Sequence, residues 1–154
     1  MIQVNTQPAC EMATNLRDAK IRIMNKSDSL LEHFLKVVFY PQDINQNKWR
    51  NEIATRLVEC SRLKSSSTNK KFDRSVYALL FTTLCSSQEE LEEQAEAFSR
   101  EFNIDNLPRV DLSSIDFSAC YQKFQSLQKK ALEILVQQRI ADREEFRAII
   151  DKEI

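Results

Sequence analysis

Glycine is absent from all 154 residues of the chain. At its usual frequency of about 7%, a protein of this length contains roughly eleven glycines. Glycine supplies the positive φ angles of tight hairpins and strand bulges, whereas helices need it least, since asparagine can replace it at their C-terminal ends. Its absence therefore argues against a β-rich fold. It also excludes the Walker A loop, the dinucleotide-binding fingerprint and the nucleophile elbow, which all depend on glycine.

Histidine and paired cysteines are equally scarce. The single histidine, His33, is adjacent to Glu32, and neighbours on a helix do not face each other, which predicts a structural or surface role for it. The four cysteines are Cys10, Cys60, Cys85 and Cys120. No Cys-x-x-Cys pair occurs among them, so neither a zinc site nor any other cofactor is expected. We expect four separately buried free thiols, and two disulfides are the alternative in an oxidising compartment.

Long hydrophobic runs are also missing. Apolar runs such as residues 37–40 are short, and none exceeds six residues, far short of the roughly 20 residues that a membrane span requires. The polar stretch 1–7 lacks the apolar segment of a signal peptide. We therefore expect no membrane partner and a cytoplasmic location.

Apolar residues recur at spacings of three and four along most of the chain, a pattern typical of helices. We predict an all-α fold in which residues 1–154 form a single domain, a helical bundle of five to seven mostly antiparallel helices. Residues 1–7 are expected to be flexible. The predicted helices cover 8–25, 29–39, 46–63, 72–85, 87–102 and 114–152, the last being either continuous or broken near 140–142.

Polar residues and proline mark the predicted helix ends. Pro41 ends helix 29–39, because the residue before a proline avoids helical geometry. The serines and glutamates of residues 86–90 form overlapping capping boxes, and Asp142 can cap a helix that begins there. Helix 29–39 is apolar nearly all round, which predicts that it is the most buried element.

Charge divides the chain unevenly. Residues 1–80 carry a net charge of +5 and residues 81–154 a net charge of −6. The basic excess surrounds the polar stretch 64–71, which is predicted to be a loop. The candidate residues for binding nucleic acid or an acidic partner are Arg56, Arg62, Lys64, Lys70, Lys71 and Arg74. Clustered lysine and arginine bind phosphate backbones, and a solvated loop without a partner is the alternative.

Two apolar groups are candidates for contact with a partner. Tyr40, Pro41 and Trp49 surround the turn after helix 29–39, where we expect them to pack the corner. The helix over 141–154 is predicted either to protrude and pair with another chain or to fold back onto its own bundle. Its candidate interface residues are Ile140, Phe146, Ile149 and Ile150.

These observations predict a non-catalytic protein–protein interaction module: an adaptor, a regulator or a small subunit of a larger assembly. Its partner is expected to be another protein or a second copy of the chain, because opposite charges on the two halves can orient a partner or drive head-to-tail association. The alternative function is a small helical nucleic-acid-binding subunit that uses the basic surface 56–74. No catalytic, cofactor-binding or metal-binding residues are predicted, and no enzymatic activity is expected.

Overall fold

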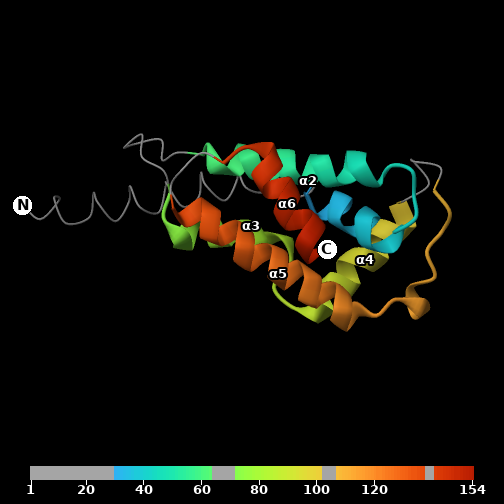
Figure 1. Ribbon diagram of the computed structural model, residues 1–154. Coiled ribbons are helices and arrows are strands. Elements are labelled where there is room, and N and C mark those ends of the chain that lie inside the picture. Colours follow the sequence, from blue (N-terminus) through green and yellow to red (C-terminus); the bar gives the residue numbers. More distant parts are fainter. Residues whose placement is uncertain (1–29, 64–71, 102–106, 138–140) are drawn as a thin grey trace, which may run out of the picture.

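The computed structural model describes residues 30–63, 72–101, 107–137 and 141–154. Within these ranges every regular element is helical, which confirms the all-α prediction (Figure 1). The elements are a helical segment at 30–39, α2 (Gln46–Ser61), α3 (Arg74–Leu84), α4 (Gln88–Glu101), the 3-10 turn η3 (Leu112–Ser114), α5 (Phe117–Val136) and α6 (Arg143–Glu153). No helix in this part of the chain is long and apolar enough to cross a membrane.

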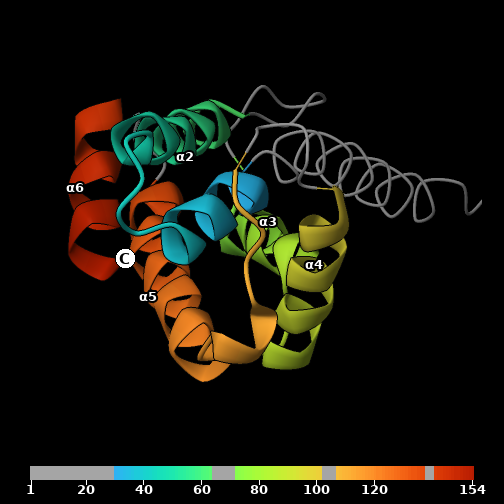
Figure 2. The ribbon, with the colours of Figure 1, turned by 90° about the vertical axis from the view of Figure 1, so that its right-hand side faces the viewer.

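The helical segment 30–39 lies inside the bundle, enclosed by the other helices (Figure 2). Its buried apolar residues are Leu30, Leu31, Phe34, Leu35, Val37 and Phe39. Lys36 is also buried, and its ammonium group lies 3.2 Å from the Glu32 carboxylate one helical turn earlier. A helix that is apolar nearly all round has no face suited to water, so its central position follows from its sequence.

Phe124 on α5 joins three elements at the centre of the core. Its ring meets the Phe34 ring edge-on, with 5.4 Å between centroids, and the Phe81 ring of α3 in the same way at 5.8 Å. Tyr121 stacks on it at 6.5 Å. One continuous hydrophobic core contains buried residues from every described α-helix. Figure 1 shows α3 and α5 running in opposite directions beside each other, as expected of antiparallel neighbours.

Aspartate residues begin three of the described helices. In each case the carboxylate accepts a hydrogen bond from the backbone N–H three residues later, which satisfies a donor that the first turn of a helix leaves free. The three caps are Asp73 on α3 at 3.2 Å, Asp116 on α5 at 3.1 Å and Asp142 on α6 at 2.8 Å. The cap predicted at Asp142 is therefore confirmed.

The start of α4 uses serine and glutamate together, as the capping boxes predicted. The Ser87 hydroxyl accepts from the Glu90 N–H at 3.1 Å, and the Glu90 carboxylate accepts from the Ser86 N–H at 2.9 Å and from the Ser86 hydroxyl. These hydrogen bonds from Ser86 lower the pKa of Glu90 below its ordinary value. The glutamate thus reaches back one residue further than a standard capping box requires.

The long C-terminal segment is two helices. Helix α5 ends at Val136 and α6 begins at Arg143, so the broken form of the two predicted alternatives is confirmed. The two helices pack against different neighbours. Helix α5 lies against α3 and α4, whereas α6 contacts mainly α2.

Helix α6 folds back onto its own bundle, which is the second of the two predicted arrangements, and the alternative of a protruding partner interface is not what the structure shows for Phe146, Ile149 and Ile150. Phe146 and Ile150 are 0% exposed in the core, and Ile149 is half-buried against it. Ile140 lies outside the described residues. The apolar stripe of α6 is therefore covered within the chain, where packing does not carry the entropy cost of association.

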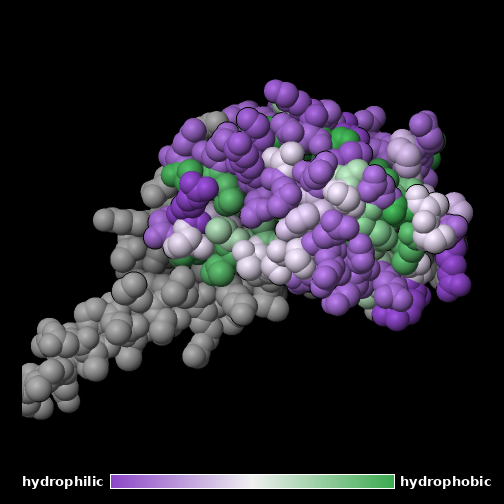
Figure 3. Space-filling model, turned by 90° about the horizontal axis from the view of Figure 1, so that it is seen from below, coloured by the Kyte–Doolittle hydropathy of each residue, from purple (hydrophilic) through white to green (hydrophobic). Residues whose placement is uncertain are grey.

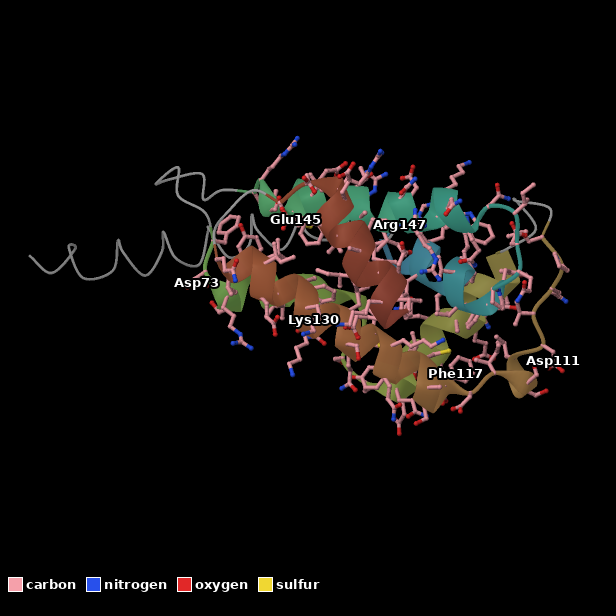
Figure 4. The ribbon with its side chains drawn as sticks, in the orientation of Figure 1. Asp73, Asp111, Phe117, Lys130, Glu145 and Arg147 are labelled. Atoms are coloured by element: carbon pink, nitrogen blue, oxygen red, sulfur yellow. The ribbon has the colours of Figure 1, made fainter. Side chains whose placement is uncertain are left out.

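Several hydrogen bonds join α6 to α2, and Figure 4 labels one of the donors, Arg147 of α6. The Arg147 guanidinium donates to the Asn47 side-chain oxygen at 2.8 Å and to the Asn51 side-chain oxygen at 2.8 Å. In the reverse direction, Arg50 of α2 donates to the Asp151 carboxylate at 3.1 Å. Charged hydrogen bonds that leave few partners unmatched stabilise such a contact more than an exposed ion pair does.

Candidate functional site

The turn after the helical segment 30–39 is a hydrogen-bonded corner at residues 40–45. The Tyr40 carbonyl accepts from the Asp43 N–H at 3.1 Å and from the Gln46 side-chain amide at 2.7 Å, and the same amide donates to the Val37 carbonyl at 3.0 Å. The Trp49 ring is buried and lies 6.3 Å from the Tyr40 ring. The predicted corner packing is confirmed for Tyr40 and Trp49, whereas Pro41 is exposed.

Ile44 lies on this corner with 95% of its surface exposed to solvent. Among the described residues it is the large hydrophobic side chain that is exposed. The next residue fixes the backbone beside it, because the Asn45 N–H donates to the Asp43 carboxylate at 2.8 Å. Sequence reasoning missed Ile44. The available signal was an isoleucine placed within a polar turn, outside any helical apolar stripe.

A small hollow, partly open to solvent and with room for about one water molecule, lies where the end of the helical segment 30–39, the end of α4 and the stretch 107–111 meet. Its lining residues are Phe39, Tyr40, Phe98, Ser99, Arg109 and Val110. The Tyr40 hydroxyl donates to the Pro108 carbonyl and ties the corner to this stretch. Burial and the nearby Asp43 carboxylate raise the pKa of Tyr40, so the hydroxyl keeps its proton for that bond. Figure 2 views the molecule from this end.

The underside of the molecule, which includes α5, has a different character (Figure 3). Hydrophilic residues cover most of its described part, and hydrophobic ones appear there in small separate areas. Exposed polar residues of α5 include Gln125 and Lys129. This face therefore offers positions for matched control substitutions.

Three of the six residues of the predicted basic surface lie in the described part of the chain. Arg56 is engaged on α2 itself, with its guanidinium 2.9 Å from the Glu59 carboxylate and 3.6 Å from the Glu52 carboxylate. Arg62 at the end of α2 and Arg74 at the start of α3 are exposed. Outside the described residues lie Lys64, Lys70 and Lys71. Two glutamates neutralise Arg56, so it contributes little positive potential to this surface.

The described cysteines are separately buried free thiols, as predicted, and Cys10 lies outside the described ranges. The Cys85 thiol donates to the Ser87 carbonyl at 3.0 Å. Burial raises the pKa of Cys85 and of Cys120, and the protonated thiol is the less nucleophilic form. Among the residues the structure describes, no three histidine, cysteine, aspartate or glutamate side chains gather in a way that could hold a metal ion.

Comparisons of the chain with protein-family models, with curated proteins and with solved structures find no match. Functional inference must therefore start from the chain's own surface. On the described surface, the most distinctive feature is the corner that carries Ile44 together with the adjacent stretch that lines the hollow.

Proposed function

We propose that this protein is a non-catalytic protein–protein interaction module and that it binds its partner through the corner at residues 40–45. The observation that carries the proposal is the 95% exposure of Ile44 on a turn fixed by hydrogen bonds. A turn whose backbone is already fixed loses little backbone entropy when a partner covers it. Burying an isoleucine of this kind contributes about 1.5–3 kcal/mol.

The surroundings of Ile44 define the chemistry of the partner. Pro41 and Gln42 are exposed and Asp43 is half-buried. The isoleucine is therefore an apolar side chain whose neighbours in the turn are mostly polar. Protein interfaces commonly have this anatomy, with an apolar centre that excludes water and polar groups around it. The fitting partner is a protein with a small apolar pocket whose edge carries hydrogen-bonding groups.

Site-specific photo-crosslinking in the source cells tests this proposal. A photoreactive amino acid at position 44 is expected to give one dominant protein adduct. The same amino acid at position 125, on the exposed polar face of α5, is the matched control and is expected to give none. The same adducts at both positions, or none at position 44, would overturn the proposal.

Once the adduct has identified the partner, the effect of substitutions at position 44 on the binding affinity can be predicted. With the purified partner, Ile44→Asp is expected to weaken binding about tenfold, because a charged group would enter the apolar pocket. Ile44→Val should retain most of the affinity, since it removes a single methylene group. Isothermal titration calorimetry measures both, and the thermal midpoint of each variant should equal that of the wild type because the side chain is exposed. An unchanged affinity for Ile44→Asp would contradict the prediction.

A second candidate function, a nucleic-acid-binding subunit, rests on one specific contact. The Tyr77 hydroxyl of α3 donates to the Leu63 carbonyl at 3.3 Å, so the two chain ends that flank residues 64–71 lie together. Exposed Arg62 and Arg74 stand on these two ends. Arg62 and Arg74 therefore stand on neighbouring chain segments, and two positive charges on adjacent segments support recognition of a phosphate backbone.

For this second candidate, a Lys70→Glu and Lys71→Glu double variant is expected to weaken binding to all nucleic-acid sequences alike. Wild-type binding should also fall steeply as the salt concentration rises, because bound phosphates release counterions. Fluorescence anisotropy with a labelled oligonucleotide measures both effects. The matched control is Lys123→Glu with Lys129→Glu, which makes the same charge change on α5. Equal effects of the two double variants, or no binding at low salt, would dispose of this function.

A further inference from the structure

The helical segment 30–39 ends with a carbonyl group whose usual hydrogen-bond donor is missing. In a helix the Val37 carbonyl accepts from the N–H of the fourth residue ahead, which here is Pro41, and proline has no N–H. The side chain of Gln46 takes its place, because its Nε2 donates to the Val37 carbonyl at 3.0 Å and to the Tyr40 carbonyl at 2.7 Å. Gln46 is the first residue of α2. This side chain therefore ties the end of one helix to the start of the next and closes the corner between them.

Arg50 determines which way the Gln46 amide group points. The Nε atom of Arg50 donates to the Oε1 atom of Gln46 at 3.0 Å. A guanidinium only donates and a carbonyl only accepts, so a single orientation of the amide satisfies all of its contacts. Turning the amide over would place its oxygen against two carbonyl oxygens and its NH2 group against a cation. The contact with Arg50 therefore keeps the two donor hydrogens of Gln46 directed at the corner.

Helix α6 in turn holds Arg50. Its Nη1 atom donates to the Asp151 carboxylate at 3.1 Å and to the Ile150 carbonyl at 3.4 Å. The Arg50 side chain is 19% exposed, so water competes weakly for its donor groups. A continuous chain of hydrogen bonds thus runs from α6 through Arg50 and Gln46 to the corner that carries Ile44.

We propose that Gln46 and Arg50 are positioning residues that make the shape of the corner depend on the seating of α6. With α6 in place, Arg50 orients the Gln46 amide and the amide fixes the corner. When α6 moves away, the amide loses its orienting contact and the corner loosens. This inference rests on the proposed function in one respect, that the corner is the binding surface. It adds a means of regulation, because an event that displaces α6 would change the conformation in which Ile44 meets a partner.

Amide hydrogen exchange of the full ¹⁵N-labelled chain measures the local stability of the corner. The reporters are the amides of Asp43 and Asn45, which both donate hydrogen bonds within the corner. Gln46→Glu is expected to speed their exchange about tenfold, because a carboxylate still accepts from Arg50 but cannot donate to the two carbonyls. A glutamate in the first turn stabilises a helix through its dipole, so a weaker α2 would not explain this result.

Two further variants test the rest of the hydrogen-bonded chain. Arg50→Met keeps the aliphatic part of the side chain and removes its donors, and Asp151→Ala removes the acceptor on α6. Each is expected to speed exchange of the same two corner amides about threefold, since each loosens the Gln46 amide indirectly. The matched control is Glu144→Ala, which removes an exposed carboxylate from the same helix and should leave the corner amides unchanged.

Three results would overturn the inference: unchanged corner exchange in Gln46→Glu or Arg50→Met, equal effects of Asp151→Ala and Glu144→Ala, or an equal rise at the buried amides of α5. The last result would mean that the variants weaken the whole fold, whereas a positioning role changes exchange at the corner alone. Exchange at the corner requires no partner. Failure here is therefore distinguishable from failure of the proposed function, which is the absence of a specific adduct at position 44.

Discussion

A Phe124→Ala variant is expected to lose about 3–5 kcal/mol of its free energy of unfolding. That is a large share of the roughly 5–15 kcal/mol that holds a native domain together. Phe124 is 0% exposed, and its ring contacts rings from two other elements, Phe34 and Phe81. Its truncation therefore leaves a cavity where three helices meet, and the helices cannot close that cavity independently. Urea unfolding followed by circular dichroism measures the loss.

Phe117→Ala is the matched control, because Phe117 lies on the same helix and makes a similar ring contact, with Phe39 at 6.4 Å. Phe117 is only partly buried against the core, so its truncation opens space to water rather than an enclosed cavity. We expect a loss of about 1–2 kcal/mol for this variant. Equal losses for both variants would contradict the central role of Phe124, provided that the dependence on urea concentration stays the same.

Local signals were sufficient to predict most of the fold. Asp142 caps a helix because its side chain reaches an N–H three residues ahead, and this contact depends on the nearest neighbours alone. Pro41 ended a helix for a similarly local reason, a clash with the preceding residue. The burial of most of residues 30–39 followed from apolar residues on nearly every side of the helix. Each of these predictions used information contained within a few consecutive residues.

The position of α6 could not be predicted in this way. Whether its apolar stripe meets the same chain or another depends on contacts between residues far apart in sequence. Arg147 donates to Asn47 and Asn51, which precede it by 100 and 96 residues. Neither asparagine carries a sequence signal that distinguishes it as a partner. The stripe of Phe146 and Ile150 indicated a buried surface correctly, but it did not indicate which surface covers it.

The candidate site was missed because it does not form a pattern in the sequence. Groups of apolar or charged residues are recognisable in a sequence, whereas Ile44 is a single apolar residue that is distinguished by its exposure to solvent. The hollow combines Phe39, Phe98 and Val110, which come from three separate elements. Of these, Phe98 on α4 is half-buried against the core, and nothing in the sequence indicates that its ring borders the hollow.

Ionisation of Tyr77 makes the free energy of unfolding depend on pH in the alkaline range. It is 1% exposed, packs against the Phe72 ring at 6.2 Å and donates from its hydroxyl to the Leu63 carbonyl. Burial, and then the electrostatic effect of nearby Cys60, raise the pKa of Tyr77 from 10.0 to about 12. The folded chain therefore retains this proton at a pH where the unfolded chain has lost it. The resulting stabilisation is fully present below about pH 10 and is lost as the pH rises toward about 12.

Comparison of the wild type with Tyr77→Phe isolates this effect, since phenylalanine keeps the ring and removes the ionisable hydroxyl. At pH 8 the variant should be less stable by about 1 kcal/mol, because it lacks one hydrogen bond. Between pH 8 and pH 11 the wild type should lose roughly 1.4 kcal/mol more than the variant, with a limit of about 2.7 kcal/mol above pH 12. Cys85 and Cys120 are present in both chains, so their alkaline titrations cancel in the difference. Parallel stability curves, measured by urea unfolding at each pH, would show that the phenol of Tyr77 ionises equally well in the folded and unfolded chains.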